Sequence, residues 1–484
     1  MPVWTSEEVA RILEGELKGD GRVQTAGCVL DSRQAKAGEI FFALPGEKAD
    51  GHKFIKAAWN NGANVAVAAK SRVGEFPEAL DVPPGKALLL VHSPFEALRA
   101  LARAWRQFLG AKVIGITGSN GKTTTKDMVA AVLEQRYRVF KNSGNHNNEL
   151  GLPLTVLNAP EDTEILVLEM GMRGLGEIKA LCEIAQPDTG VITNIGSTHL
   201  ELLGTQERIA QAKWELIDSL PPHGTAVLNA EDSWSATKGN NDPHSRLFYG
   251  LEGKYENPEV RGYGLKPWGS LGTSFKVRMG EEEAKVFLPL PGGHNVLDAL
   301  AALAVGTVYG VRLQDGCHGL KELKLSKLRL EVHEGFAGSV LISDVYNANP
   351  VSMQASLRVL KERAQDNDTL AILGEMYELG AESEHGHRSV GETLAALGVS
   401  ELITVGALAE DIARGALAVG LSPERVHTCV TREEGVALAK DVLNRRRQPT
   451  WVLIKGSRGM KMEEVTAGLK HVSGNPRVGE GRII

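Results

Sequence analysis

A short run of glycine, lysine and threonine inside residues 112–125 has the composition of a phosphate-binding loop. It follows an apolar stretch and opens a helix-forming one. Gly118 and Gly121 permit backbone conformations and close approaches that a side chain would block. Backbone N–H groups at a helix N-terminus attract anions. Lys122 can reach the β- and γ-phosphates of a nucleotide, and Thr123 can offer its hydroxyl to Mg²⁺.

The match to the standard phosphate-loop pattern is incomplete. That pattern has a glycine five residues before Gly121, and this chain has Ile116 there. The alternative is a glycine-rich turn with a solvated lysine. We favour phosphate binding because apolar strand, Gly-Lys-Thr and helix occur in the required order. The nucleotide-binding residues expected here are Thr117, Gly118, Ser119, Asn120, Gly121, Lys122 and Thr123.

Two further apolar runs, 163–168 and 191–195, end in Glu169 and close to His199. Ligands of open α/β sheets bind beyond the carboxyl ends of strands, and an acidic residue there can hold Mg²⁺ beside a phosphate loop. Taken singly, Glu169 could be a solvated helix start, His199 a loop histidine and Lys213 a surface lysine. One shared side of a sheet would bring them together, which favours a joint phosphate and metal site.

These residues need a sheet to position them, and strands and helices alternate along most of the chain. Alternation of this kind predicts an α/β fold with parallel, doubly wound sheets. A length of 484 residues suggests about three domains. We predict a small N-terminal α/β domain (1–84), a central, mostly parallel phosphate-loop domain (85–326) with a β-rich part at 245–290, and a C-terminal Rossmann-like α/β domain (327–484).

Composition narrows the class of protein. The apolar fraction of 42% and charged fraction of 24% are ordinary for a globular protein, and the net charge of −6 argues against a nucleic-acid partner. The N-terminus lacks a signal-peptide core, and no apolar run approaches a membrane span. The cysteines fit neither a metal site nor a disulfide framework. We expect a cytoplasmic monomer without a membrane segment. The cysteines are Cys28, Cys182, Cys317 and Cys429.

Five segments together resemble the Mur ligases, which are ATP-dependent amide-bond ligases of peptidoglycan precursor synthesis. The resemblance covers nearly the whole chain in the three-domain order of that family. The segments are 117–123, 169–171, 194–201, 212–215 and 294–295.

Residues 344–350, Asp-Val-Tyr-Asn-Ala-Asn-Pro, are similar to the signature of the family member that joins D-alanyl-D-alanine to UDP-N-acetylmuramoyl-tripeptide. The motifs typical of two other branches of the family do not occur in the chain. The resemblance therefore implies that activity and those two substrates. Two alternatives stay open: a sibling ligase that adds the third amino acid, and an ATP-gated binding protein that ligates nothing.

The resemblance also implies roles for single residues. Lys122 and Thr123 would bind ATP, with Thr123 and Glu169 at a first Mg²⁺ and His199 at a second. Lys213 would carry an N6-carboxyl group and bind metal through it, which requires the uncharged amine to be accessible. Lys122, Glu169, His199 and Lys213 are thus the expected catalytic set.

Further implied contacts lie outside this set. Asn295 would contact adenine, and Arg329 and Asp344 would close onto the nucleotide from the third domain. The family often has asparagine where this chain has Asp298, four residues after His294. The resemblance places Asp31, Ser32 and Arg33 by the uridine diphosphate of the substrate. The implied substrate-binding residues are these three and Asn145, Asn147, Asn148, Tyr346, Asn347 and Asn349.

The implied mechanism brings two anions together, because a substrate carboxylate attacks the γ-phosphate of ATP. Two Mg²⁺ ions and Lys122 would offset that repulsion. The resulting acyl phosphate would be shielded from water by domain closure until the amine of the dipeptide attacks it.

Overall fold

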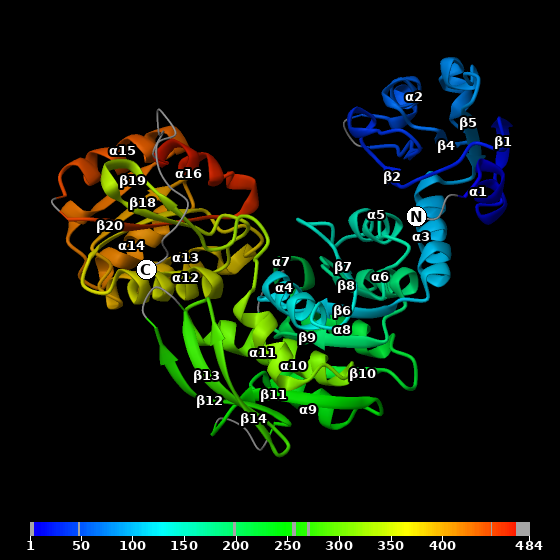
Figure 1. The fold of residues 1–484 in the computed structure, drawn as a ribbon. Helices are drawn as coiled ribbons and strands as arrows, with labels where there is room; N and C mark the ends of the chain where they lie inside the picture. Colours follow the sequence, from blue (N-terminus) through cyan, green and yellow to red (C-terminus); the bar gives the residue numbers. More distant parts are fainter. Residues whose placement is uncertain are drawn as a thin grey trace, which may run out of the picture.

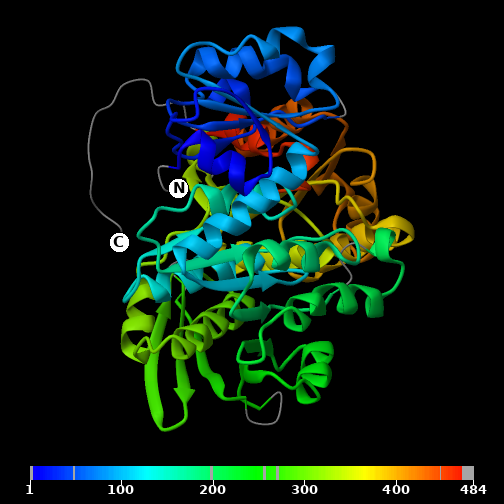
Figure 2. The same ribbon diagram turned by 90° about the vertical axis from the view of Figure 1, so that its right-hand side faces the viewer.

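The structure is a computed structural model and describes residues 4–46, 49–196, 200–253, 258–268, 272–446 and 448–470. Three sheets of five, nine and six strands divide the chain in sequence order, which confirms the expected three-part α/β fold. Figure 1 shows the second part between the other two, which lie on its two sides. Figure 2, turned by 90°, shows the first part above the second.

The first sheet has the strand order β1-β5-β4-β3-β2, and only the β1–β5 pair is antiparallel. Its strands are β1 (Glu16–Gly19), β2 (Cys28–Val29), β3 (Ile40–Phe42), β4 (Val65–Ala69) and β5 (Ala87–Val91). The accompanying helices are α1 (Ser6–Ile12), the 3-10 turns η1 (Ser32–Gln34) and η2 (Gly51–Phe54), α2 (Ile55–Asn61) and α3 (Pro94–Leu109).

The predicted domain boundary at residue 84 cuts this sheet. β5 begins at Ala87 and lies between β1 and β4, hydrogen-bonded to both. An interior strand cannot be separated from its sheet without losing both ladders of hydrogen bonds. We therefore propose that the first domain extends at least to Val91, and that Pro83-Pro84-Gly85 is a turn inside it.

The second sheet has the order β14-β13-β12-β11-β10-β9-β6-β8-β7, parallel from β7 to β12 and antiparallel among the last three strands. Its strands are β6 (Lys112–Thr117), β7 (Val139–Lys141), β8 (Ile165–Glu169), β9 (Thr189–Ile192), β10 (Thr225–Asn229), β11 (Ser245–Leu251), β12 (Val260–Pro267), β13 (Thr273–Met279) and β14 (Glu282–Leu288). The last four confirm the expected β-rich part.

Helices cover both faces of the second sheet. One face packs against α4 and α10, and the other packs against α6 and α8 in an apolar cluster that continues through α3 into the first part. The helices are α4 (Lys122–Leu133), α5 (Gly151–Leu157), α6 (Glu177–Ala185), α7 (Leu200–Leu203), α8 (Gln206–Asp218), α9 (Ser233–Asn240), α10 (Gly293–Val308) and α11 (Leu313–Lys321).

The third sheet has the order β15-β16-β20-β17-β18-β19 and is parallel except for β15. Its strands are β15 (Glu331–Glu334), β16 (Val340–Ser343), β17 (Asp368–Gly374), β18 (Glu401–Val405), β19 (Val426–Cys429) and β20 (Thr450–Lys455). Its helices are α12 (Pro350–Ala364), α13 (Ser383–Ala396), α14 (Glu410–Ala418), α15 (Arg432–Asn444) and α16 (Glu463–Leu469). The boundary at residues 326–327 stays a prediction.

The strand pairing brings the ends of β6, β8 and β9 side by side in the second sheet, and those of β16 and β20 in the third. β6 pairs with β8 so that Ile116 faces Glu169, and with β9 so that Thr117 faces Ile192. In the third sheet, Ser343 of β16 faces Ile454 of β20, so the residues that follow them, Asp344 and Lys455, are neighbours.

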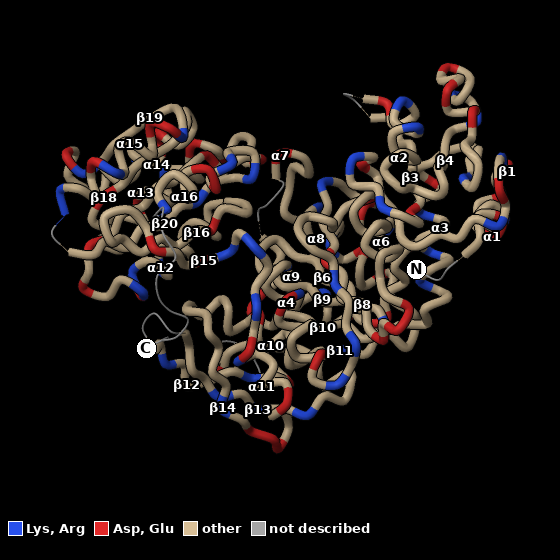
Figure 3. Tube along the Cα trace, turned by 45° about the horizontal axis from the view of Figure 1, so that its top comes forward, with Lys and Arg blue, Asp and Glu red and all other residues tan. Residues whose placement is uncertain are grey.

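Charge is spread over the molecule rather than gathered in one part. Figure 3 shows basic and acidic residues interspersed along all three parts. Anion binding by this chain must therefore come from local geometry. None of the helices among the described residues is both long and apolar enough to cross a membrane.

Candidate active site

The loop between β6 and α4 bends around two glycines with positive φ, Gly118 at 153° and Gly121 at 80°. A Cβ atom on Gly118 would lie 1.9 Å from Thr193 Oγ1, and one on Gly121 would lie 2.6 Å from Asp298 Oδ1. Both positions therefore require glycine, because of the backbone conformation and because neighbouring side chains approach so closely.

Residues that follow β9 fix the backbone of this loop. Ser119 N donates to Asn194 O (2.9 Å), and Asn120 N donates to Asn194 Oδ1 (3.0 Å). Thr193 Oγ1 donates to Asn120 O (2.5 Å). The loop is thus held from the neighbouring strand, as anion-binding loops need to be in order to keep their shape.

Lys122 begins α4 and turns back over the loop. Its Nζ donates to Gly118 O (2.8 Å) and to Ser119 O (3.4 Å). Burial lowers the pKa of Lys122, and the nearby charge of Glu169 opposes this effect. The ammonium group has carbonyl partners only among the described residues, which leaves its charge available to an anion.

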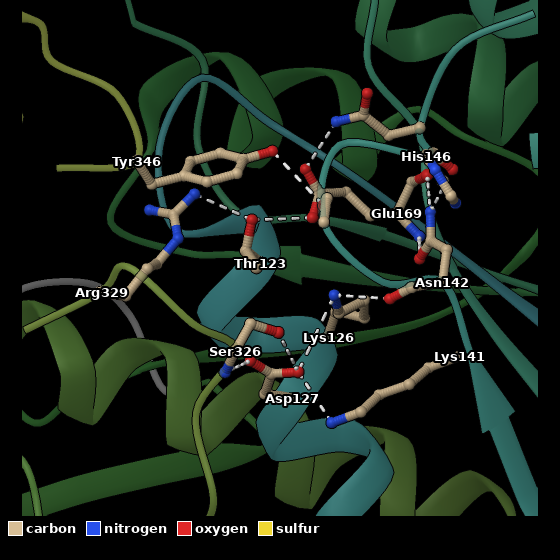
Figure 4. Close-up of polar contacts among 12 residues, drawn as sticks. Thr123, Lys126, Asp127, Lys141, Asn142, His146, Glu169, Ser326, Arg329 and Tyr346 are labelled. Atoms are coloured by element: carbon tan, nitrogen blue, oxygen red, sulfur yellow. Dashed lines mark hydrogen bonds and ion pairs between the residues drawn. The ribbon is translucent and has the colours of Figure 1, made fainter. Parts of the chain in front are cut away.

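Glu169 ends β8 and is only 2% exposed. Its carboxylate accepts a hydrogen bond from Thr123 Oγ1 (2.7 Å), as Figure 4 shows, and another from Asn147 Nδ2 (2.8 Å). Asn142 fixes its backbone, since Asn142 Oδ1 accepts from Glu169 N and Asn142 Nδ2 donates to Glu169 O (both 2.9 Å). A carboxylate touching a threonine hydroxyl is an oxygen donor set that suits Mg²⁺.

The metal assignment from the sequence stays a prediction. Among the described residues no group of three or more His, Cys, Asp or Glu side chains could hold a metal ion. Mg²⁺ does not require such a group, because it is usually bound by one or two carboxylates together with phosphate oxygens and waters. His199, predicted at the second ion, lies outside the described residues.

Lys213 lies on α8 and is 2% exposed. Burial, and after it the positive charge of Lys122, lowers the pKa of Lys213 well below its ordinary value. Within the described ranges its Nζ has neither a hydrogen bond nor an ion pair. A buried lysine in this setting favours the uncharged amine, which is the form that reacts with CO₂.

Arg329 reaches this site from the segment that leads into the third sheet. Its Nη2 donates to Thr123 Oγ1 (2.9 Å), and its guanidinium carbon lies 4.2 Å from the centre of the Tyr346 ring. Its Nε is buried and has no hydrogen-bond partner in the part of the chain that is described. An unsatisfied planar donor beside a phosphate-type loop fits a phosphate oxygen.

Asp344 and Lys455 meet at the ends of β16 and β20, with Lys455 Nζ 2.5 Å from Asp344 Oδ2. Ser356 Oγ also donates to Asp344 Oδ2 (2.7 Å). Burial favours the neutral acid, but the charge and hydrogen bond of Lys455 outweigh it and lower the pKa of Asp344. This carboxylate is therefore ionised and fixed in direction.

The start of α10 borders the loop from the other side. Asn295 is 3% exposed, and its Nδ2 donates to Pro291 O (2.7 Å). Burial raises the pKa of Asp298 to about 8, although the hydrogen bond from Thr125 Oγ1 (3.0 Å) opposes this rise. Burial also lowers the pKa of His294 to about 4, so this histidine is neutral.

A single cavity of about 1110 Å³ joins these groups. It brings together the predicted loop residues 117–123, Glu169 and Lys213 of the second part with Arg329 and Asp344 of the third. Predicted residues that also line it are Asn145, Asn147, Asn148, Asn295, Tyr346, Asn347 and Asn349.

Three predicted residues lie elsewhere. Ser32 and Arg33 belong to η1 of the first part, Asp31 caps its N-terminus, and none of the three lines the cavity. Arg33 pairs with Asp31 (2.7 Å), and its side chain is 86% exposed. Their assignment to the uridine diphosphate stays a prediction.

Sequence reasoning missed some lining residues, including Arg173, Tyr377 and Asn194. Asn194 was expected only as part of a longer segment, although an asparagine directly after a strand end is a signal for a loop contact. Arg173 and Tyr377 carry no such signal, because each reaches the cavity only through the folded positions of its loop.

Models of three domains match the chain. They are described as Mur ligase family, catalytic domain (residues 25–106), Mur ligase middle domain (116–306) and Mur ligase, glutamate ligase domain (328–458). A relative from Bacillus subtilis (strain 168) is 37% identical over 475 residues, which are 96% of this chain and 98% of the relative. The chain belongs to the Mur ligase family.

A second relative supports the assignment of this chain to the Mur ligase family. A relative from Escherichia coli (strain K12) is 32% identical over 96% of this chain and 98% of its own length. It and the Bacillus relative are both named UDP-N-acetylmuramoyl-tripeptide--D-alanyl-D-alanine ligase.

Solved Mur ligase structures have the same three-part fold. A crystal structure of MurF from Acinetobacter baumannii matches with a TM-score of 0.84 and 30% identity over 96% of this chain and 99% of that one. MurF ligase from Thermotoga maritima in complex with ADP matches with a TM-score of 0.75 and 32% identity over 92% of this chain and 97% of that one.

Proposed function

We propose that this chain is an ATP-dependent ligase of peptidoglycan precursor synthesis that joins D-alanyl-D-alanine to UDP-N-acetylmuramoyl-tripeptide and releases ADP and phosphate. The observation that carries the chemistry is one cavity with a phosphate-type loop, Lys122 and Glu169 on one wall and Arg329 on the other. The choice of substrates rests on relatives of that name at 37% and 32% identity over nearly the whole chain.

The nucleotide would lie with its phosphates on the loop after β6. Lys122 and Arg329 offer cationic donors to those phosphates, and the buried unsatisfied Nε of Arg329 supports this placement. Asn295, at the start of α10, would contact the adenine. A related protein of the same fold has been solved with ADP.

Thr123 and Glu169 are the residues that would hold a first Mg²⁺, and His199 and carboxylated Lys213 would hold a second. The ions would supply charge neutralisation between the triphosphate and the attacking carboxylate. The oxygen donors of Thr123 and Glu169, in contact at 2.7 Å, fit such an ion.

The protein's own groups must do two things in this reaction before the amide bond forms. Lys122 and Arg329 stabilise the charge on the transferred phosphoryl group, which lets the tripeptide carboxylate attack the γ-phosphate. The walls of the cavity then keep water from the acyl phosphate. Finally, the dipeptide amine attacks the acyl carbon, the C–N bond forms and phosphate leaves.

The substrates would enter along the remaining walls of the same cavity. Asn145, Asn147 and Asn148 would face the tripeptide from the second part, and Tyr346, Asn347 and Asn349 would face it from the third. Asp31, Ser32 and Arg33 would hold the uridine diphosphate. We propose a monomer as the working unit, since the described residues of one chain supply both the loop on one wall of the cavity and Arg329 on the other.

Carboxylation of Lys213 has a direct test. We expect Lys213→Ala to lose activity, and a Lys213→Ala enzyme supplied with a short-chain carboxylic acid to regain part of it. Mass spectrometry of the intact wild-type protein in ¹³C-bicarbonate, after chemical trapping, would detect the added carboxyl group. Full activity of Lys213→Ala without any additive would contradict this assignment.

The function is tested by incubating the purified chain with ATP, UDP-N-acetylmuramoyl-tripeptide and D-alanyl-D-alanine. We expect equal amounts of ADP, phosphate and the pentapeptide nucleotide by liquid chromatography and mass spectrometry. Turnover with a single amino acid but not with the dipeptide would identify a sibling ligase. ATP binding without turnover of any amine would identify a binding protein. Lys122→Met serves as the inactive control.

A further inference from the structure

The segment that joins the second and third sheets lies along α4 and touches it at two points. Asp127 accepts from Ser326 N at Oδ2 (2.7 Å) and from Ser326 Oγ at Oδ1 (3.0 Å). Three residues later, Arg329 Nη2 donates to Thr123 Oγ1 (2.9 Å). Thr123 and Asp127 are four residues apart on α4 and therefore share one face of the helix. Figure 4 shows both contacts on that face.

The backbone is strained at two residues, one that lies between these two contacts and one that directly follows the second. Leu328 has a φ of 68° and Leu330 a φ of 48°, on either side of Arg329. Left-handed conformations disfavour residues with a Cβ, so they persist only where the surroundings impose them. The surroundings do so from the third sheet, because Val345 N and Tyr346 N both donate to Leu328 O (3.1 Å). On the side of α4, Asp127 is the only described side chain that forms hydrogen bonds with Ser326.

The position of Asp127 suits a contact with this segment rather than a contact with a ligand in the cavity. It is 1% exposed and does not line the cavity. Its remaining strong partner is Lys141, whose Nζ lies 2.7 Å from Oδ1. Lys126 Nζ is farther away, at 3.8 Å, and donates instead to Asn142 O. The carboxylate is thus buried, paired with Lys141 and directed at the segment that joins the second and third sheets.

We propose that Asp127 is a positioning residue that places Arg329 at the phosphate-type loop by holding Ser326 on α4. The inference rests on the proposed function, because it assigns Asp127 an effect on the ligase reaction. Without this anchor no described hydrogen bond ties Ser326 to α4, so the segment that carries Arg329 can move away from Thr123. The nucleotide loop itself keeps its other supports.

A double-mutant cycle, in which kcat is measured, tests whether Asp127 acts through Arg329. We expect Asp127→Asn to lower kcat about tenfold, since a buried charge-assisted hydrogen bond is lost, and to change ATP affinity less than about threefold. In an Arg329→Ala background the same substitution should change kcat less than about twofold, because its effect passes through Arg329. Equal factors in both backgrounds would overturn the proposal, since they would mean that Asp127 acts independently of Arg329.

Milder variants guard against misfolding. Ser326→Ala removes one of the two hydrogen bonds and should lower kcat about threefold, whereas Ser326→Thr keeps the hydroxyl and should stay within about twofold of wild type. Lys141→Met removes the partner of Asp127 that is not on the linker, and it should leave kcat within about twofold. A loss of kcat in Lys141→Met as large as that in Asp127→Asn would assign Asp127 a structural role and overturn the proposal.

The same data separate this inference from the function on which it rests. A wild-type chain that makes no pentapeptide nucleotide contradicts the proposed function. An active wild-type chain with independent Asp127 and Arg329 effects contradicts only the role of Asp127.

Discussion

Asp298→Asn should stabilise the protein, and the gain should grow with pH. Asp298 is 8% exposed under the loop at Gly121, and burial raises its pKa from the ordinary 3.8 to about 8. Between these values the unfolded chain carries an ionised Asp298 and the native chain a protonated one. The native state therefore binds the extra proton, and its stability falls as pH rises from about 4 to about 8.

The size of the effect follows from the shift. Each pH unit in this window costs the native state about 1.36 kcal/mol, so moving from pH 5 to pH 7 costs about 2.7 kcal/mol. Asparagine has the same shape, can still accept the hydrogen bond from Thr125 Oγ1 and does not titrate. The advantage of Asp298→Asn over wild type should thus be greater by about 2.7 kcal/mol at pH 7 than at pH 5. If the second part unfolds as one unit of about 200 residues, this equals about 5–10 °C in Tm.

Thermal unfolding of both proteins at pH 5, 6 and 7 measures this difference, and comparison at each pH cancels the titration of all other groups. Asp315→Asn makes the same chemical change at a half-exposed site of α11, where Asp315 pairs with Arg312 (2.7 Å). We expect it to stay within about 0.5 kcal/mol at each pH. An Asp298→Asn gain that is constant or decreases with pH would refute the argument that this acid is neutral.

Three further substitutions test other parts of the site. Lys455→Met leaves Asp344 buried without its partner, so it should lower the free energy of unfolding by about 3–5 kcal/mol, measured with denaturant. The control is Lys70→Met, which removes an exposed pair with Glu16 and should cost less than about 1 kcal/mol. Glu169→Gln keeps the size of the side chain but removes its charge, and it should raise the Mg²⁺ concentration for half-maximal turnover at least about tenfold; an unchanged Mg²⁺ requirement would exclude Glu169 as a ligand. Gly118→Ala puts a Cβ 1.9 Å from Thr193 Oγ1 and should weaken ATP binding at least about tenfold by calorimetry, whereas Gly74→Ala, with nothing within 4 Å of its Cβ, should not.

Local patterns predicted the fold wherever one segment determines its own structure. The glycine loop, the strand that ends in Glu169 and the β-rich part at 245–290 follow from composition and order within a few residues. The boundary at residue 84, which we propose to move to Val91 or beyond, illustrates the opposite case. Pro83-Pro84-Gly85 marks a turn, but only the pairing of β5 with β4 and β1 decides to which sheet the next strand belongs.

Contacts between distant segments could not be predicted from spacing. Ser326 and Asp127 are 199 residues apart, and nothing in either segment alone indicates that they pair. The partnership of Asp344 with Lys455 depends on β16 and β20 being adjacent and parallel, which is a property of the sheet. The family resemblance supplied Arg329 as a nucleotide contact, but only the folded chain explains what holds it in place.

In the cavity the opposite charges of Lys122 and Glu169 are kept apart. This separation supports a reaction in which two negatively charged groups must approach each other. Lys122 is half-buried and Glu169 is buried, and the charge of Glu169 acts on the pKa of Lys122, yet within the described residues neither forms an ion pair. If stability alone had shaped the site, the two would gain from pairing directly, as Asp344 and Lys455 do a short distance away. Instead Lys122 is held by loop carbonyls and Glu169 by Thr123 and Asn147, so each presents its charge to a ligand of opposite sign. A triphosphate would meet the first need and Mg²⁺ the second, and under the proposed function a substrate carboxylate would approach the γ-phosphate only when both are met.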